Sequence, residues 1–234
     1  MPPRRQYRDA MGPRIILVTD PAFGDELTVR CIETVARTVP RGWLCVQLRD
    51  KHRSSASLRV FGSRLRLVTR AVGATLVLNG NAEIGRDIGA EGVHLGEDAG
   101  AVDLARTVFG RPAWISVAAH SDKGVRRAVA EGANAVLVSP IFASRPPSLS
   151  APAKVPRGLE AVRSARAIAE KAAVGRGSLG QRCGIYALGG VGPDNVRACL
   201  RAGADGIAVL RALLASATPS RVARRLAEAF AVSA

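Results

Sequence analysis

The chain has 234 residues, of which 47% are apolar, so it is long enough to bury a large core. Its 34 basic and 19 acidic residues leave a formal charge of +15, which would suit a nucleic acid or an anionic membrane surface. Only four of the basic residues are lysines, the arginines are dispersed, aromatic residues are few, and no nucleic-acid-binding motif occurs. We therefore attribute the charge to compositional bias on a solvated surface and do not expect a nucleic acid as the partner.

The four cysteines, Cys31, Cys45, Cys183 and Cys199, lie far apart and show no spacing typical of zinc ligands. Cys45 stands in the apolar run WLCVQL, which predicts a buried, reduced thiol and favours a cytoplasmic protein. A basic N-terminal extension, residues 1–13, is followed by an apolar run too short for a secretory signal. No stretch is long enough to span a bilayer, so we expect no membrane association.

Short apolar runs typical of strands alternate with segments that have the i, i+3, i+4 apolar spacing of helices. The runs predict strands at 14–19, 43–49, 74–79, 92–95, 113–118, 134–139, 184–188 and 206–210. Because these runs lack polar alternation, they indicate parallel strands that are covered on the outside. Eight such units predict an α/β protein with a single (β/α)8 TIM barrel over residues 14–234. An open doubly wound sheet is the alternative, but the glycine-rich turn it needs after the first strand is missing.

Function in such a barrel gathers at the carboxyl ends of the strands. The seventh strand ends in Gly189-Gly190, and the eighth runs into Leu210-Arg211 at the start of a short helix. Amides that converge from these two loops would bind a phosphate. A plain tight turn at the two glycines is the alternative interpretation.

The second strand ends with Gln47, Arg49 and Lys51 at alternating positions, which point to the same side if the chain is still extended. An Arg and a Lys at a barrel mouth suit a second anionic group such as a pyrophosphate. Alternatively, Lys51 and Arg53 are solvated loop charges.

Polar residues also end the third, fourth, fifth and sixth strands. We expect Asn79 and Ser139 to bind substrate, and His120 to lie in the barrel mouth. His94 is expected to be a hydrogen-bonded barrel residue rather than a base, and His52 a loop residue.

Seven ordered motifs carry a resemblance to a known family: ILVTDP, VQLRDK, GAEGVHLGED, ISVAAHS, VLVSPIF, ALGGV and GADGIAVL. Their order and spacing, from residue 14 to 214, resemble the thiamine phosphate synthase/TenI family. The resemblance implies a (β/α)8 barrel of thiamine biosynthesis that binds a thiazole phosphate. It also implies one of two chemistries: Mg²⁺-dependent joining of hydroxymethylpyrimidine diphosphate to the thiazole phosphate, or a metal-free proton shift by a thiazole tautomerase.

The resemblance implies that a synthase has an aspartate directly after the asparagine that ends the third strand, and that this aspartate binds Mg²⁺. This chain has Gly80 at that position. The second metal carboxylate of the family falls at or next to Ala99, whereas Asp98 comes one place early. Because Mg²⁺ needs carboxylate oxygens, a metal site here would require Glu97 and Asp98 to turn inward.

The sixth loop also departs from the synthase pattern. Ser144, Arg145 and two prolines stand where the family has a Thr-x-Thr-Lys run, and Lys154 follows later. The loop is long enough to act as a lid, and a disordered insertion is the alternative.

Asn79-Gly80 is similar to the tautomerase branch, whose acid/base histidine after strand five matches His120. Histidine suits a proton shift near neutral pH. We therefore take a metal-free isomerase with His120 as acid/base as the first hypothesis, needing no cofactor. The alternative is a synthase with Mg²⁺ and hydroxymethylpyrimidine diphosphate, because Gln47-Arg49-Lys51 resembles that branch. A non-catalytic phosphate- or nucleic-acid-binding barrel is a distant third, and a homodimer stays open.

Overall fold

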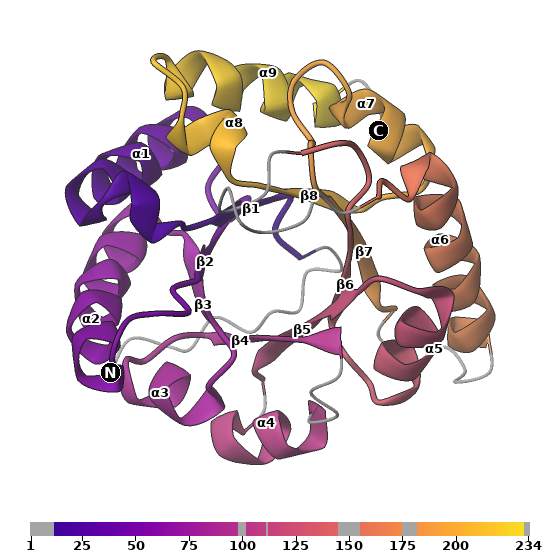
Figure 1. Ribbon diagram of the computed structural model, residues 1–234, viewed down its shortest axis with the longest axis horizontal. Coiled ribbons are helices and arrows are strands. Elements are labelled where there is room, and N and C mark those ends of the chain that lie inside the picture. The colour runs from indigo at the N-terminus through magenta and orange to yellow at the C-terminus, as the bar shows by residue number, and fades with distance from the viewer. Residues whose placement is uncertain (1–11, 98–101, 111, 145–154, 175–181, 232–234) are drawn as a thin grey trace.

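The computed structural model describes residues 12–97, 102–110, 112–144, 155–174 and 182–231. Eight parallel strands form one closed sheet, in which neighbours follow chain order and the last strand pairs back with the first. Helices surround the sheet on its outside (Figure 1). The chain is therefore a single (β/α)8 barrel, which confirms the predicted class and rules out the open sheet.

The eight strands lie within one residue of the ends predicted from the apolar runs. They are β1 (Ile15–Val18), β2 (Leu44–Leu48), β3 (Thr75–Asn79), β4 (Gly92–Leu95), β5 (Trp114–Ala119), β6 (Ala135–Val138), β7 (Gly184–Leu188) and β8 (Gly206–Val209).

A helix follows each strand, and two shorter turns of helix are added. The main helices are α1 (Asp25–Thr38), α2 (Ser55–Val72), α3 (Ala82–Asp87), α4 (Val102–Phe109), α5 (Asp122–Ala130), α6 (Gly158–Val174), α7 (Val196–Arg201) and α9 (Pro219–Ala231). The short ones are the 3₁₀ turn η1 (Pro21–Phe23) and α8 (Arg211–Leu214), which is the short helix predicted after the eighth strand. Among the described residues, no helix combines the length and apolar character needed to cross a bilayer.

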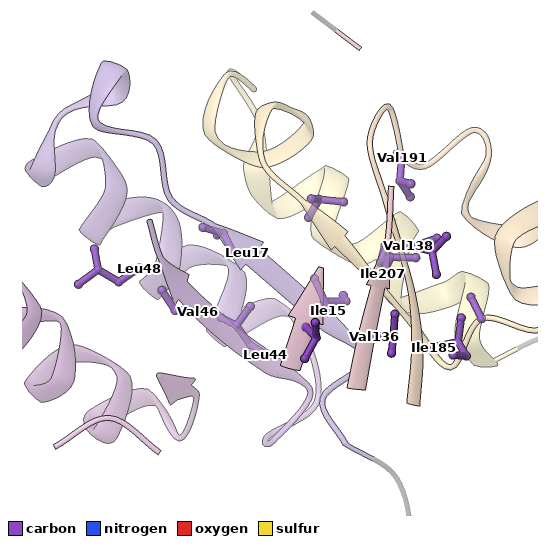
Figure 2. Close-up of a cluster of buried hydrophobic side chains, with 14 of the residues drawn as sticks. Ile15, Leu17, Leu44, Val46, Leu48, Val136, Val138, Ile185, Val191 and Ile207 are labelled. Carbon is purple, nitrogen blue, oxygen red and sulfur yellow. The ribbon is translucent and has the colours of Figure 1, made fainter. Parts of the chain in front are cut away.

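Alternate residues of each strand are buried on opposite faces of the barrel wall. Ile15 and Leu17 of β1 pack in the layer between the strands and the helices, part of which Figure 2 shows. Ile16 and Val18 of the same strand pack inside the barrel. Burial on both faces explains why the strands read as unbroken apolar runs.

Two aromatic side chains fill the amino-terminal half of the barrel interior. The rings of Trp114 and Tyr186 meet edge to face with centroids 6.1 Å apart, and the Tyr186 hydroxyl donates to the Pro13 carbonyl at 2.6 Å. Gly206 makes room for this ring, because a Cβ there would lie 2.4 Å from Tyr186 Cε1. With the amino end filled, the carboxyl end is where a ligand has access to the interior.

Candidate active site

Polar side chains form a band inside the barrel toward its carboxyl end. Asn79 pairs in register with His94, and His94 with Ser116, so three neighbouring strands place these residues at one level. His94 and Ser116 are buried, as is Gln47 on the adjacent strand, while Asn79 is half-buried. Sequence reasoning did not single out Ser116, although the motif ISVAAHS contains it, because it stands within an apolar run before the strand end.

The structure brings Gln47 and Asn79 together. Gln47 Nε2 donates to Asn79 Oδ1 at 3.1 Å, which fixes both amides. Gln47 Oε1 is buried and has no hydrogen-bond partner within the described part of the chain. A buried acceptor without a donor is costly, so this atom indicates where an N–H or O–H group of a ligand would be bound.

His94 is the hydrogen-bonded barrel residue that was predicted. Its Nδ1 lies 2.9 Å from Ser116 Oγ. Burial, together with the charges of Arg49 and His120, lowers the pKa of His94 to about 4. The ring is therefore neutral at pH 7.

His120 follows β5 and is exposed at the mouth. Its Nδ1 lies 2.9 Å from the Ser139 carbonyl oxygen and 3.2 Å from Ser139 Oγ. A carbonyl only accepts, so in this contact Nδ1 carries the proton and Nε2 of the neutral ring is left as the basic nitrogen. Ser139 therefore orients the imidazole, a contact that its position after β6 did not reveal.

Glu97 joins the fourth loop to the fifth. Its Oε2 accepts from the His120 amide at 2.9 Å, and its Oε1 accepts from Ser121 Oγ at 2.7 Å. Gly124 permits this approach, because a Cβ there would lie 1.9 Å from Oε1. The carboxylate thus holds the backbone of His120, a role that sequence reasoning did not assign to it.

Arg49 and Lys51 differ in how firmly they are placed. Thr19 Oγ1 accepts from the Arg49 amide at 2.9 Å and donates to the Arg49 carbonyl at 3.2 Å, so the backbone at Arg49 is held from β1. Arg49 is half-buried, whereas Lys51 is exposed in a bend beyond the strand. The extended alternation expected from Gln47 to Lys51 therefore ends at Leu48, the last residue of β2.

The loops after β7 and β8 have the form expected of a phosphate cradle. Gly189 and Gly190 both have positive φ, and within the described chain neither amide donates to a protein acceptor. Leu210 is the N-cap of α8 and Arg211 is its first residue, so the Arg211 amide precedes any acceptor within that helix. Both loops can thus present amides to an anion.

The described donors of the third and fourth loops, which end at Glu97, do not fit a carboxylate-bound Mg²⁺. Asn79 Oδ1 is used by Gln47, Asn81 Oδ1 accepts from the Ile84 amide, and Gly80 has no side chain. Both Glu97 oxygens already accept hydrogen bonds. No cluster of three or more His, Cys, Asp or Glu suited to a metal occurs in the described ranges. Asp98, the other carboxylate named for this site, lies outside them, as do Arg145 and Lys154 of the sixth loop.

Fold and site together define a (β/α)8 barrel with a polar, arginine-bearing mouth. The sequence pattern of the family described as TMP-TENI, thiamine monophosphate synthase, matches residues 15–213. The chain belongs to this family, which confirms the resemblance seen in the seven motifs.

Curated relatives agree with this assignment. The thiamine-phosphate synthase of Moorella thermoacetica is 32% identical over 197 residues, covering 84% of this chain and 87% of that protein. The thiamine-phosphate synthase of Halorhodospira halophila is 35% identical over 195 residues, which cover 83% of this chain and 86% of that protein. The solved thiamine phosphate pyrophosphorylase from Pyrococcus furiosus has a TM-score of 0.74 at 22% identity, over 94% of this chain and 96% of that one, which supports the fold.

The lowered pKa of His94 predicts a pH-dependent stability. Below about pH 6.5 the unfolded chain binds a proton on this histidine, whereas the folded chain does so only near pH 4. The free energy of unfolding should therefore fall as pH drops through this window, by on the order of 3 kcal/mol more in the natural chain than in His94→Asn. Urea unfolding at a series of pH values measures the difference. His52→Asn, at an exposed loop position, should keep the natural slope; equal slopes for His94→Asn and the natural chain would contradict the assignment.

Proposed function

We propose that this protein is a thiamine-phosphate synthase, a transferase that joins hydroxymethylpyrimidine diphosphate to a thiazole phosphate. The observation that carries the proposal is the likeness to proteins of that name at 32% to 35% identity over more than four fifths of the chain. Gln47, Arg49 and Lys51 at the end of β2 support it, since this run resembles the synthase branch.

In this reaction the thiazole nitrogen attacks the methylene carbon of the pyrimidine, a C–N bond forms, and the C–O bond to the diphosphate breaks. Pyrophosphate leaves with the electron pair of that bond. The attacking ring nitrogen carries no proton, so the bond-forming step needs no general base.

Each part of the mouth has a task in this proposal. The amides near Gly189, Gly190 and Arg211 would hold the thiazole phosphate. Arg49 and Lys51 would neutralise the charge that develops on the leaving pyrophosphate. The buried Gln47 Oε1 would accept a hydrogen bond from a substrate N–H and so orient its ring.

A thiazole tautomerase is the second candidate, and two observations favour it. Gly80 supplies no metal carboxylate, and His120 presents a basic Nε2 whose tautomer the Ser139 carbonyl selects. A proton shift between ring carbon and nitrogen needs one group of this kind and no metal. The relatives reported above are named synthases, so this first hypothesis of the sequence analysis is not confirmed.

The cradle predicts a loss of phosphate binding in Gly190→Ala. The new Cβ would lie 2.5 Å from the Ala143 carbonyl oxygen and 2.8 Å from Phe142 Cβ, so the loop must shift. Calorimetry with inorganic phosphate should show affinity reduced by about tenfold or more. Gly132→Ala is the matched control, because it shares a positive φ but its Cβ would meet open space. Equal phosphate affinity in the natural chain and Gly190→Ala would overturn the cradle.

A second prediction separates the two candidate chemistries by metal dependence. The purified protein, given both substrates, should form thiamine phosphate and pyrophosphate, and Gly80→Asp should raise the Mg²⁺-dependent rate severalfold because it adds a carboxylate at an open position. Gly80→Asn is the matched control, of the same size and with the same backbone strain but without the charge. No coupling by either the natural chain or Gly80→Asp, with or without Mg²⁺, would refute the synthase proposal.

His120→Asn provides the third prediction. An Asn amide can still donate to the Ser139 carbonyl, and coupling requires no proton transfer, so we expect synthase turnover to stay within about tenfold of the natural rate. A tautomerase would instead lose on the order of 10²- to 10⁴-fold in proton transfer while keeping its affinity for thiazole phosphate. Measuring both reactions on the same preparation decides between the candidates.

A further inference from the structure

The loop after β2 carries Arg49 and Lys51, yet both lie beyond the last strand residue, Leu48. Thr19 holds the backbone at Arg49, but nothing in β2 itself holds the residues that follow. A loop that binds an anion must order its backbone as well as its side chains, so a backbone that is already fixed lowers the cost of binding. The structure fixes it through Arg53.

Arg53 forms ion pairs with Asp25 and Asp50, so it is not the solvated loop charge that the sequence analysis gave as an alternative. Its Nη1 and Nη2 donate to the two carboxylate oxygens of Asp25 at 3.0 and 2.7 Å, and its Nε donates to Asp50 Oδ2 at 2.9 Å. The guanidinium also lies over the Phe61 ring, 4.6 Å from its centroid. The Arg53 side chain is only 19% exposed.

The same network closes the bend that contains Lys51. Asp50 Oδ1 accepts from the amides of His52 and Arg53 at 3.1 and 3.0 Å, while its Oδ2 accepts from the Arg53 side chain. Asp25 is the first residue of α1, and Phe61 lies in α2, two helices that pack side by side (Figure 1). The bend is therefore tied to both helices.

The charges of Arg53, Asp25 and Asp50 indicate that the network holds the loop in place and does not itself attract an anion. Arg53 brings one positive charge and its two partners bring two negative charges, so the group as a whole does not attract an anion. Arg49, Asp50 and Arg53 line one surface hollow together with Asp25, which places the network beside Arg49.

We propose that Arg53 and Asp25 are positioning residues, which hold Arg49 and Lys51 in place for the diphosphate of the substrate. The inference rests on the proposed function, because it assumes that this loop binds a diphosphate. Arg53 donates to Asp25 and to Asp50, and through Asp50 the pair acts on the backbone of the loop.

Asp25→Asn and Arg53→Lys test this with inorganic pyrophosphate as the probe in calorimetry, with and without Mg²⁺. Asp25→Asn removes a negative charge, so simple electrostatics predicts tighter pyrophosphate binding, whereas loss of positioning predicts weaker binding. Arg53→Lys keeps the charge but loses the planar fork that reaches Asp25 and Asp50. We expect both variants to bind pyrophosphate roughly tenfold more weakly than the natural chain.

Asp87→Asn and Arg59→Lys are matched controls. They alter an exposed Arg–Asp pair between α2 and α3, with the same charge changes, and should leave pyrophosphate affinity unchanged. In a Lys51→Ala background, Asp25→Asn should reduce pyrophosphate affinity by a smaller factor, because the Lys51 side chain that Asp25 helps to position is absent. In turnover assays the KM for the pyrimidine diphosphate should rise while the KM for thiazole phosphate stays the same.

Three outcomes distinguish this inference from the proposed function. If the natural protein makes thiamine phosphate and both variants bind pyrophosphate as tightly as it does, the inference is wrong and the proposed function stands. Tighter binding by Asp25→Asn overturns it as well, in favour of plain electrostatics. A natural chain that neither binds pyrophosphate nor makes thiamine phosphate refutes the proposed function, and the inference with it.

Discussion

Closure of eight parallel strands into one barrel is the constraint on which the rest of the structure depends. Closure makes every strand bury both faces, and parallel order brings all eight carboxyl ends to one mouth. The interior has limited space, and Trp114 and Tyr186 occupy its amino-terminal half. Among the described residues, the polar band of Gln47, His94 and Ser116 therefore lies in the carboxyl-terminal half of the interior, next to the mouth.

The fold, and which residues lie at the mouth, could be predicted from the sequence. Both follow from the apolar pattern of each strand and from the closure of the barrel. Once eight apolar runs are counted, the residues after each run must share one rim, so Asn79, His120 and Gly190 are found together without any knowledge of contacts. The contacts themselves were beyond reach. Ser116 meets His94, Glu97 meets the His120 amide and Arg53 meets Asp25 across 22, 23 and 28 positions. Such contacts depend on rotamers and loop paths, which no periodicity encodes.

Glu97 illustrates how a correctly chosen residue can have a different task. Its position beside the fourth strand end made it a candidate metal ligand, and the structure indeed places it at the mouth. Gly124 lets its carboxylate approach the start of α5, where it accepts from the His120 amide and the Ser121 hydroxyl. A carboxylate that organises the fifth loop is less free to hold a cation, since doing so would release two donors near the candidate acid/base histidine.

The charge balance of the mouth bears on how a diphosphate would be handled. Arg49 and Lys51 are cationic, His94 is neutral at pH 7 because its pKa is about 4, and Gly80 contributes no negative charge. In the proposed synthase, a rim of this kind would attract a diphosphate before the reaction and would stabilise the leaving pyrophosphate through fixed positive charge. The same charge would also bind the pyrophosphate product, so its release would be the step most exposed to becoming slow. Thr19 holds the Arg49 backbone and Asp50 closes the bend that contains Lys51, so both cations would meet a diphosphate from a held backbone, while the exposed Lys51 side chain keeps its contact with solvent.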